Sequence, residues 1–142
     1  ELQKNETLNF RDSSGYLGLG WSHNSKKNGV WSEGNTSTLF FKTKENYGNI
    51  KLEIFLNPYL TKNKTTKEFD VYVNNKLNKK FELKNNSEVN KIEILIDGKQ
   101  IKNNEVKIDF IFKNLISPYE ALESPDSRKL GILVKNIKLV KI

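Results

Sequence analysis

The sequence predicts an all-β protein, a jelly-roll-like antiparallel β-sandwich with one short helix before the last strand. Apolar and polar residues alternate along most of the chain, and turn-forming residues separate the alternating stretches at short intervals. A length of 142 residues with 36% hydrophobic residues suits one domain with a single core. We therefore expect one domain over residues 1–142. We also expect it to be excised from a longer protein, because the chain starts with neither an initiator methionine nor a signal-peptide profile.

Seven stretches show the period of two that is typical of a strand with one buried face. The stretch 50–56 is the clearest, because four aliphatic side chains share one face and Lys51 and Glu53 lie on the other. In chain order the seven stretches are 7–10, 38–42, 50–56, 69–73, 80–83, 91–96 and 106–112. An eighth strand ends the chain.

The final strand contains a change of phase. Its apolar residues switch parity between Val134 and Ile137. A β-bulge near Lys135 and Asn136 would keep the apolar residues on both sides of the switch facing the core. The sequence therefore predicts one long bulged strand.

Two connections have local patterns of their own. The Asp-Gly pair at 97–98 predicts a hairpin turn after the strand that precedes it. In the segment 117–123, Ser117 suits the N-cap of a helix and Glu120 its third position, which gives a capping box, and Pro125 ends the helix. This is the short helix expected before the last strand.

The net charge of +7 would suit a polyanionic partner, but its composition argues against nucleic acid. The chain has 22 Lys, 19 Asn and only two Arg, Arg11 and Arg128, a bias that AT-rich codons produce. Base recognition and bidentate phosphate binding both favour Arg, and the lysines do not form a block. We expect no nucleic-acid partner, and no apolar run is long enough to predict a membrane span.

The composition also argues against catalysis. The chain has no Cys, and His23 is its one histidine, in a polar stretch typical of an exposed loop. No nucleophile elbow, EF-hand, Walker or dinucleotide-binding motif is present. We expect no catalytic residue and no cofactor. A metal stays an open question, because Ca²⁺ held by scattered oxygens leaves no linear pattern.

Both tryptophans lie in a Gly- and Asn-rich segment that looks like a hairpin. Trp21 and Trp31 are ten residues apart, and each is followed by Ser. Aromatic rings beside hydrogen-bonding side chains are typical of sugar sites. One interpretation is a glycan-binding cluster of Tyr16, Trp21, His23 and Trp31. The other, favoured for at least one tryptophan, is that the rings cap the end of the core.

A second unusual segment contains Arg128, in a chain that otherwise avoids arginine. One interpretation is that Asp126 and Arg128 tie a turn while Gly131 permits close packing. The other is that Arg128 clamps a ligand. We favour a structural motif of Asp126, Arg128 and Gly131.

Together these two segments carry a resemblance. The pattern Gly20-Trp21-Ser22 and Trp31-Ser32-Glu33-Gly34, followed by Ser117-Pro118 and 126–132 (DSRKLGI), resembles β-sandwich domains appended to bacterial glycosyltransferases and related capsule or lipopolysaccharide enzymes. The resemblance spans nearly the whole chain. It implies a non-catalytic accessory module, with the transfer chemistry in a separate domain of the parent protein.

We therefore expect a carbohydrate-binding-like accessory module of a bacterial surface-polysaccharide glycosyltransferase. Its expected partners are a glycan or polysaccharide acceptor and the catalytic domain of the parent. The resemblance places it in the bacterial cytoplasm, at the inner-membrane face. The alternative is a protein–protein interaction or oligomerisation module without a sugar site.

Overall fold

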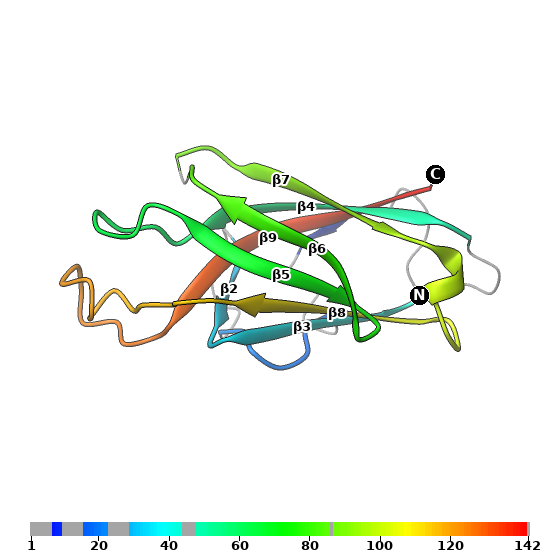
Figure 1. Ribbon diagram of the computed structural model, residues 1–142, viewed down its shortest axis with the longest axis horizontal. Coiled ribbons are helices and arrows are strands. Elements are labelled where there is room, and N and C mark those ends of the chain that lie inside the picture. The colour runs from blue at the N-terminus through cyan, green and yellow to red at the C-terminus, as the bar shows by residue number, and fades with distance from the viewer. Residues whose placement is uncertain (1–6, 10–15, 23–28, 44–47, 86, 142) are drawn as a thin grey trace.

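Two antiparallel β-sheets pack face to face and make up almost all of the structure (Figure 1). The computed structural model describes residues 7–9, 16–22, 29–43, 48–85 and 87–141. The first sheet has the order β1-β9-β4-β7, with β2 also paired to β9, and the second has the order β3-β8-β5-β6. The strands are β1 (Thr7–Asn9), β2 (Val30–Glu33), β3 (Thr36–Lys42), β4 (Ile50–Pro58), β5 (Lys67–Val73), β6 (Lys76–Leu83), β7 (Asn90–Ile96), β8 (Glu105–Phe112) and β9 (Leu130–Lys141).

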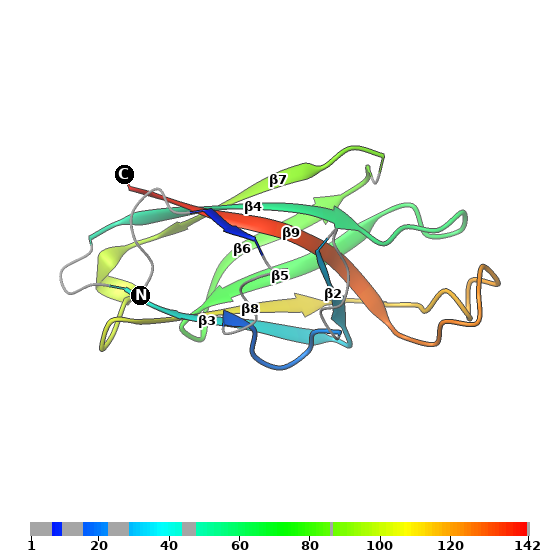
Figure 2. The same ribbon diagram turned by 180° about the vertical axis from the view of Figure 1, so that it is seen from behind.

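The chain crosses repeatedly between the two sheets, as in a jelly roll. From β2 to β5 each successive strand lies in the other sheet, and β7, β8 and β9 alternate in the same way. β1 and β2 pair with different parts of β9, β1 with Asn136–Lys138 and β2 with its first half (Figure 2). The predicted all-β sandwich is confirmed, with β2 as a strand that the alternation did not predict.

The core lies between the sheets and follows the period of two. β4 alternates buried and half-buried residues along its whole length. Ile54 is paired with Ile92 on β7 and with Ile137 on β9, and all three side chains are buried. Burying one such side chain stabilises the fold by about 1.5–3 kcal/mol, so the rows of aliphatic residues fix the register of the sheet.

The bulge predicted in the last strand is present. Phe55 is paired with Asn136 and the next residue, Leu56, with Val134, so Lys135 is the extra residue. Val134 is fully buried and Ile137 nearly so. The bulge keeps both apolar groups in the core, as the change of parity required.

The hairpin predicted at residues 97–98 is wrong. β7 ends at Ile96 in the first sheet, and the next strand, β8, lies in the second. The connection is a 3₁₀ helix, η2 (Gly98–Gln100), whose N-cap Asp97 accepts a hydrogen bond from the backbone of Lys99. Asp followed by Gly suits a helix cap as well as a tight turn, and the pairing of β8 within the second sheet decides between them.

The segment 117–123 forms hydrogen-bonded turns rather than the predicted helix. The capping box is present: Ser117 Oγ accepts from the Glu120 backbone at 3.1 Å, and Glu120 Oε1 accepts from the Ser117 backbone at 3.1 Å. The chain then turns away at Leu122, which has a φ of 61°. A capping box lowers the free energy of a first turn, but helix propagation needs further residues with helical angles.

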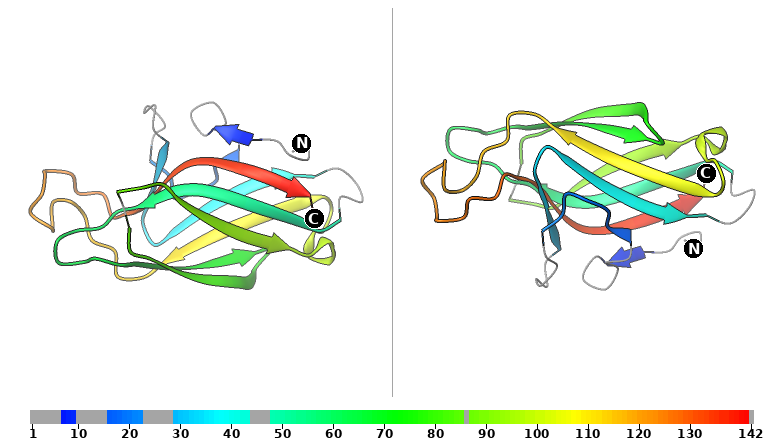
Figure 3. Two further views of the ribbon diagram at one scale, coloured as in Figure 1. Left: turned by 90° about the horizontal axis from the view of Figure 1, so that it is seen from above. Right: turned by 90° about the horizontal axis from the view of Figure 1, so that it is seen from below.

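The sandwich has two different ends along its long axis (Figure 3). The loops 59–66 and 113–129 extend from one end, and η2 and the turn at 102–105 lie at the other (Figure 1). Among the described residues, no helix is long and apolar enough to span a membrane.

Candidate functional site

The two unusual segments of the sequence meet at one end of the sandwich. They form a pocket of about 450 Å³, here called the tryptophan–arginine pocket. The sequence identified each segment separately, but their contact depends on β2 and β9 being neighbours. The lining residues are Gly20, Trp21, Glu33, Gly34, Ser127, Arg128 and Lys129.

Arg128 links the two segments through hydrogen bonds. Its Nε donates to Asp126 Oδ1 at 3.0 Å, and its Nη2 donates to Asp126 Oδ2 at 2.6 Å. Its Nη1 donates to Ser22 Oγ at 3.1 Å, and Ser22 Oγ in turn donates to Glu33 Oε2 at 2.9 Å. The result is a polar chain that runs from one carboxylate to the other through the guanidinium and the hydroxyl.

The ion pair within this chain shifts the pKa of both partners. The hydrogen bond from the Arg128 side chain lowers the pKa of Asp126, and the same bond raises the pKa of Arg128. Glu33 adds a smaller attraction that also raises the pKa of Arg128. A planar guanidinium suits this arrangement because it can hold a carboxylate with two N–H groups while a third reaches the serine.

Trp21 is both a wall of this pocket and an anchor for the loop that carries it. Its Nε1 donates to the Thr38 carbonyl at 2.9 Å, and its ring meets Phe110 edge-to-face with centroids 6.1 Å apart. Gly20, just before it, has a φ of 90°, and a Cβ there would lie 2.1 Å from the Thr36 carbonyl oxygen. The close approach and the left-handed backbone both require glycine.

Trp31 lies apart from this pocket. On β2 it is half-buried, and its ring meets Tyr59 edge-to-face at 6.2 Å. The neighbouring Ser32 is fully buried and pairs with Trp21 across the hairpin that the sequence indicated. Successive residues of a strand point to opposite faces, so Trp31 and the buried Ser32 lie on different sides of the sheet.

The three described residues of the predicted glycan cluster do not line one common pocket. Trp21 lines the pocket, whereas Tyr16 packs against the core and Trp31 packs on Tyr59. His23 lies outside the described residues. The sequence placed all four in one loop region, but pairing of β2 with β9 sends the two indoles to different surroundings.

Gly131 lies where β9 packs closely on its neighbours. A Cβ there would be 2.5 Å from Ser32 Oγ and 2.8 Å from the Phe112 ring. Ser32 Oγ accepts a hydrogen bond from the Ile132 backbone at 2.8 Å. Gly131, Asp126 and Arg128 therefore all lie at structural contacts, and Arg128 lines the pocket as well.

A buried cation next to this end was not predicted from the sequence. Lys67, at the start of β5, is 1% exposed, and its Nζ donates to the Leu130 carbonyl at 3.2 Å. Burial and, to a smaller extent, the nearby charge of Lys64 together lower the pKa of Lys67 to about 8. Lysine is too common in this chain for one residue to stand out. The one available signal was the alternation of β5, which places Lys67 on the same face as the buried Phe69.

Glu33, Ser127 and Lys129 are pocket residues that were not among the predicted site residues. The signal that could have identified them is their position in the sequence motifs 31–34 and 126–132, which flank the pocket. Lys129 forms an ion pair with Glu120, and the hydrogen bond from Lys129 lowers the pKa of Glu120. Within the described ranges, no three His, Asp or Glu side chains are grouped so that they could hold a metal ion.

No protein-family model matches the sequence, and no curated protein matches it. Solved structures do match the fold. The CBM36-1 domain of a multidomain xylanase, from the hindgut metagenome of Trinervitermes trinervoides, aligns with a TM-score of 0.58 and 11% identity over 96% of this chain and 97% of that one. A carbohydrate-binding module CBM36 in complex with calcium and xylotriose aligns at 0.54 and 10% identity, over 94% and 98% of the two chains.

A third similar structure belongs to a larger enzyme. The acetyl xylan esterase Est2A of the rumen bacterium Butyrivibrio proteoclasticus aligns with a TM-score of 0.55 and 9% identity, over 96% of this chain and 32% of that one. At such low identities these similarities establish the fold alone. This chain has the β-sandwich fold of those carbohydrate-binding modules.

Proposed function

We propose that this chain is a non-catalytic carbohydrate-binding module whose glycan site is the tryptophan–arginine pocket. One observation carries the proposal: the pocket places the indole of Trp21 beside unused hydrogen-bonding groups of Arg128, Glu33 and Ser127. A sugar presents an apolar ring face and hydroxyls that both donate and accept. A pocket with an aromatic wall and a few directed polar groups matches that chemistry.

The polar groups have capacity left for a ligand. Arg128 has five N–H groups, and Asp126 and Ser22 use three of them, so two have no partner among the described residues. Glu33 accepts from Ser22 with Oε2, which leaves Oε1 as an acceptor. The Ser127 hydroxyl can do either. The Asp126 contact holds the guanidinium in place, so a sugar would meet a preorganised donor.

The fold comparisons support this proposal and point to the type of parent protein. The neighbours include domains of a xylanase and of an acetyl xylan esterase, and one module was crystallised with xylotriose. We propose a carbohydrate-active parent that this module holds near its polymer, as a tether that raises local concentration. A glycosyltransferase parent at the inner face of the bacterial membrane stays a prediction from the resemblance.

The proposal can be tested by blocking the pocket while keeping the hydrogen bonds that hold Arg128, Asp126, Ser22 and Glu33 together. Ser127→Trp would fill the pocket from an exposed position, and Thr65→Trp adds the same ring to an exposed loop position outside it. Affinity electrophoresis through gels that contain soluble xylan or dextran measures the retention of both variants and of the unsubstituted chain. Each gel is run with EDTA and with CaCl₂, because one neighbour's complex includes calcium.

We expect at least one polysaccharide to retard the unsubstituted chain and the Thr65→Trp variant but not the Ser127→Trp variant. Equal retardation of all three proteins would show that glycan binds elsewhere. No retardation by either polysaccharide would count against the glycan site and favour an interaction module.

One observation favours that second function. Tyr119 and Leu122, in the loop 113–129, are 64% and 94% exposed, and Leu122 holds a left-handed backbone that is unfavourable for leucine. Apolar side chains at an exposed loop tip suit contact with another protein. Leu122→Asp should then abolish co-elution with the parent's catalytic domain in size-exclusion chromatography and leave retention on polysaccharide unchanged.

A further inference from the structure

We propose a second ligand site, for an acidic glycan that carries uronate carboxylates, in a pocket at the opposite end of the sandwich. This pocket, here called the lysine–asparagine pocket, has a volume of about 540 Å³, within the range of small-ligand sites. β3, β5 and β8 each extend from the first end of the molecule to this one. Its lining residues are Phe40, Val73, Asn74, Asn75, Lys76, Lys99, Gln100, Lys102, Asn103, Glu105, Val106 and Lys107.

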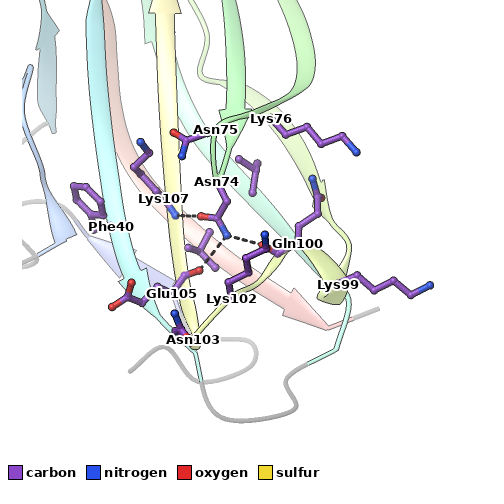
Figure 4. Close-up of a pocket in the computed structure, with 12 residues that line it drawn as sticks. Phe40, Asn74, Asn75, Lys76, Lys99, Gln100, Lys102, Asn103, Glu105 and Lys107 are labelled. Atoms are coloured by element: carbon purple, nitrogen blue, oxygen red, sulfur yellow. Dashed lines mark hydrogen bonds between the residues drawn. The ribbon is translucent and has the colours of Figure 1, made fainter.

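Asn74 fixes the geometry of this pocket (Figure 4). Its Nδ2 donates to the Gln100 carbonyl at 2.6 Å and to the Glu105 carbonyl at 3.1 Å, and its Oδ1 accepts from the Lys107 backbone at 2.8 Å. One side chain therefore ties the β5–β6 turn to η2 and to β8. Its backbone is left-handed, with a φ of 47°, as the first position of a two-residue hairpin turn requires.

The charge of the pocket is strongly one-sided. Four lysines line it against one acidic residue, Glu105. Lys107 forms an ion pair with Asp109 at 3.4 Å, whereas Lys76 and Lys102 form none with the described residues. Ammonium groups with no ion-pair partner among the described residues are available to a carboxylate, and their shared field would attract an anion before contact.

The uncharged lining suits a sugar ring. Phe40 is 50% exposed and lies on one side of Asn74, with Lys76 and Lys99 on the other (Figure 4). The side-chain amides of Asn75 and Asn103 have no hydrogen-bond partner among the described residues, so each offers both a donor and an acceptor to hydroxyls. An aromatic edge, free amides and ammonium groups together match a sugar that bears a carboxylate.

Nucleic acid fits this lining less well. The pocket has no arginine for bidentate phosphate contacts and a single aromatic ring, whereas single-stranded nucleic acid is bound by successive stacking rings. The choice of a glycan rests on the proposed function, which this inference extends to a separate site. The two sites require different variants and different polymers, so either can fail alone.

The test uses isothermal titration of the full chain with three named polymers: polygalacturonate, neutral xylan and single-stranded oligo(dT). The pocket variant is Lys76→Gln with Lys102→Gln. The charge-matched control is Lys62→Gln with Lys80→Gln, two exposed lysines outside the pocket. Both double variants lose the same net charge, so a difference between them reports the site rather than the overall field.

We expect polygalacturonate to bind the unsubstituted chain and to bind the pocket variant about tenfold more weakly. The affinity of the control variant should change less than twofold. Binding should weaken as NaCl rises from 50 to 500 mM. Xylan binding should be the same for both double variants. Equal losses in the two variants, no binding of polygalacturonate, or tighter pocket-dependent binding of oligo(dT) would each overturn the proposal. Loss of xylan retention by Ser127→Trp with polygalacturonate binding unchanged would show that the two sites are independent.

Discussion

The two ends of the sandwich are built by different kinds of contact. At the tryptophan–arginine pocket, residues about one hundred positions apart are joined directly, such as Ser22 with Arg128 and Ser32 with Ile132. At the lysine–asparagine pocket, Asn74 ties the β5–β6 turn to η2 and to β8, about thirty residues away. The first end uses Trp21 and Arg128, whose residue types occur only twice each in the chain, and the second uses Lys and Asn, the two most common types. Rarity in sequence therefore identifies one site and hides the other.

The largest expected effect separates close packing from backbone strain at the first end. Gly20 and Gly34 both have a φ near 90°, but a Cβ at Gly20 would lie 2.1 Å from a carbonyl oxygen and one at Gly34 would meet nothing within 4 Å. Gly20→Ala should lower the free energy of unfolding by about 3–5 kcal/mol, and Gly34→Ala by about 1–2 kcal/mol. Urea unfolding measures both. Equal losses would mean that strain alone, and not the clamp of this loop on β3, sets the cost.

The corresponding comparison at the second end uses two asparagines. Asn74 and Asn75 are both left-handed, with φ of 47° and 69°, but only Asn74 makes the three side-chain bonds that tie the pocket together. Asn74→Ala should cost about 2–3 kcal/mol and Asn75→Ala about 1 kcal/mol or less, measured by urea unfolding. If the two variants lose the same stability, Asn74 does not organise this end.

A buried cation should make stability depend on pH. The pKa of Lys67 is about 8 in the folded chain against 10.5 for an ordinary lysine, so the unfolded chain binds its proton more tightly. Below pH 8 the fold carries the full cost of burying the charge. As pH rises from 8 to 10.5 the folded form loses the proton first and stability should increase.

Lys67→Met should raise the free energy of unfolding by about 1–2 kcal/mol at pH 7 and remove this increase. Lys62→Met, at an exposed position in the preceding loop, serves as the control. Thermal unfolding at pH 7, 8, 9 and 10 measures both variants. If the stability of the unsubstituted chain does not change between pH 7 and pH 10, Lys67 is not the buried cation described.

The smallest expected effect tests the link between the two distant segments. Arg128→Lys and Ser22→Ala each remove the contact between the guanidinium and the hydroxyl. A double-mutant cycle should give a coupling energy of about 0.5–1 kcal/mol in urea unfolding. Arg128→Lys with Lys99→Ala, an exposed position at the opposite end of the sandwich, should be additive. A coupling near zero for Arg128 and Ser22 would mean that the polar chain contributes nothing to the contact of the segments.

Much of the fold followed from sequence because alternation fixes the faces of each strand. Even the bulge at Lys135 was predicted, since the parity change of β9 has one simple geometric solution. The connection at 97–98 was not, because its choice between a turn and η2 depends on which sheet receives β8. A local sequence pattern limits a segment to a few conformations, and strand pairing in the tertiary structure determines which one forms.

The candidate sites were predicted less completely from the sequence than the fold was. Trp21 and Arg128 stood out by rarity and do line one pocket, but Trp31 and Tyr16 do not join them. Trp31 is separated because β2 directs it and the buried Ser32 to opposite faces, and the strand character of β2 was not predicted. The lysines of the second pocket carried no distinguishing pattern. Only the meeting of the turns at 74–75 and 103–104 beside η2 makes them one surface.

The most direct test of two separate glycan sites is an NMR titration of the ¹⁵N-labelled chain, first with xylotriose and then with trigalacturonate. We expect xylotriose to shift the amides of Gly20, Gly34 and Ser127, and trigalacturonate to shift those of Asn75 and Asn103. Shifts from both sugars at the same end, or none from either at millimolar concentration, would contradict this expectation.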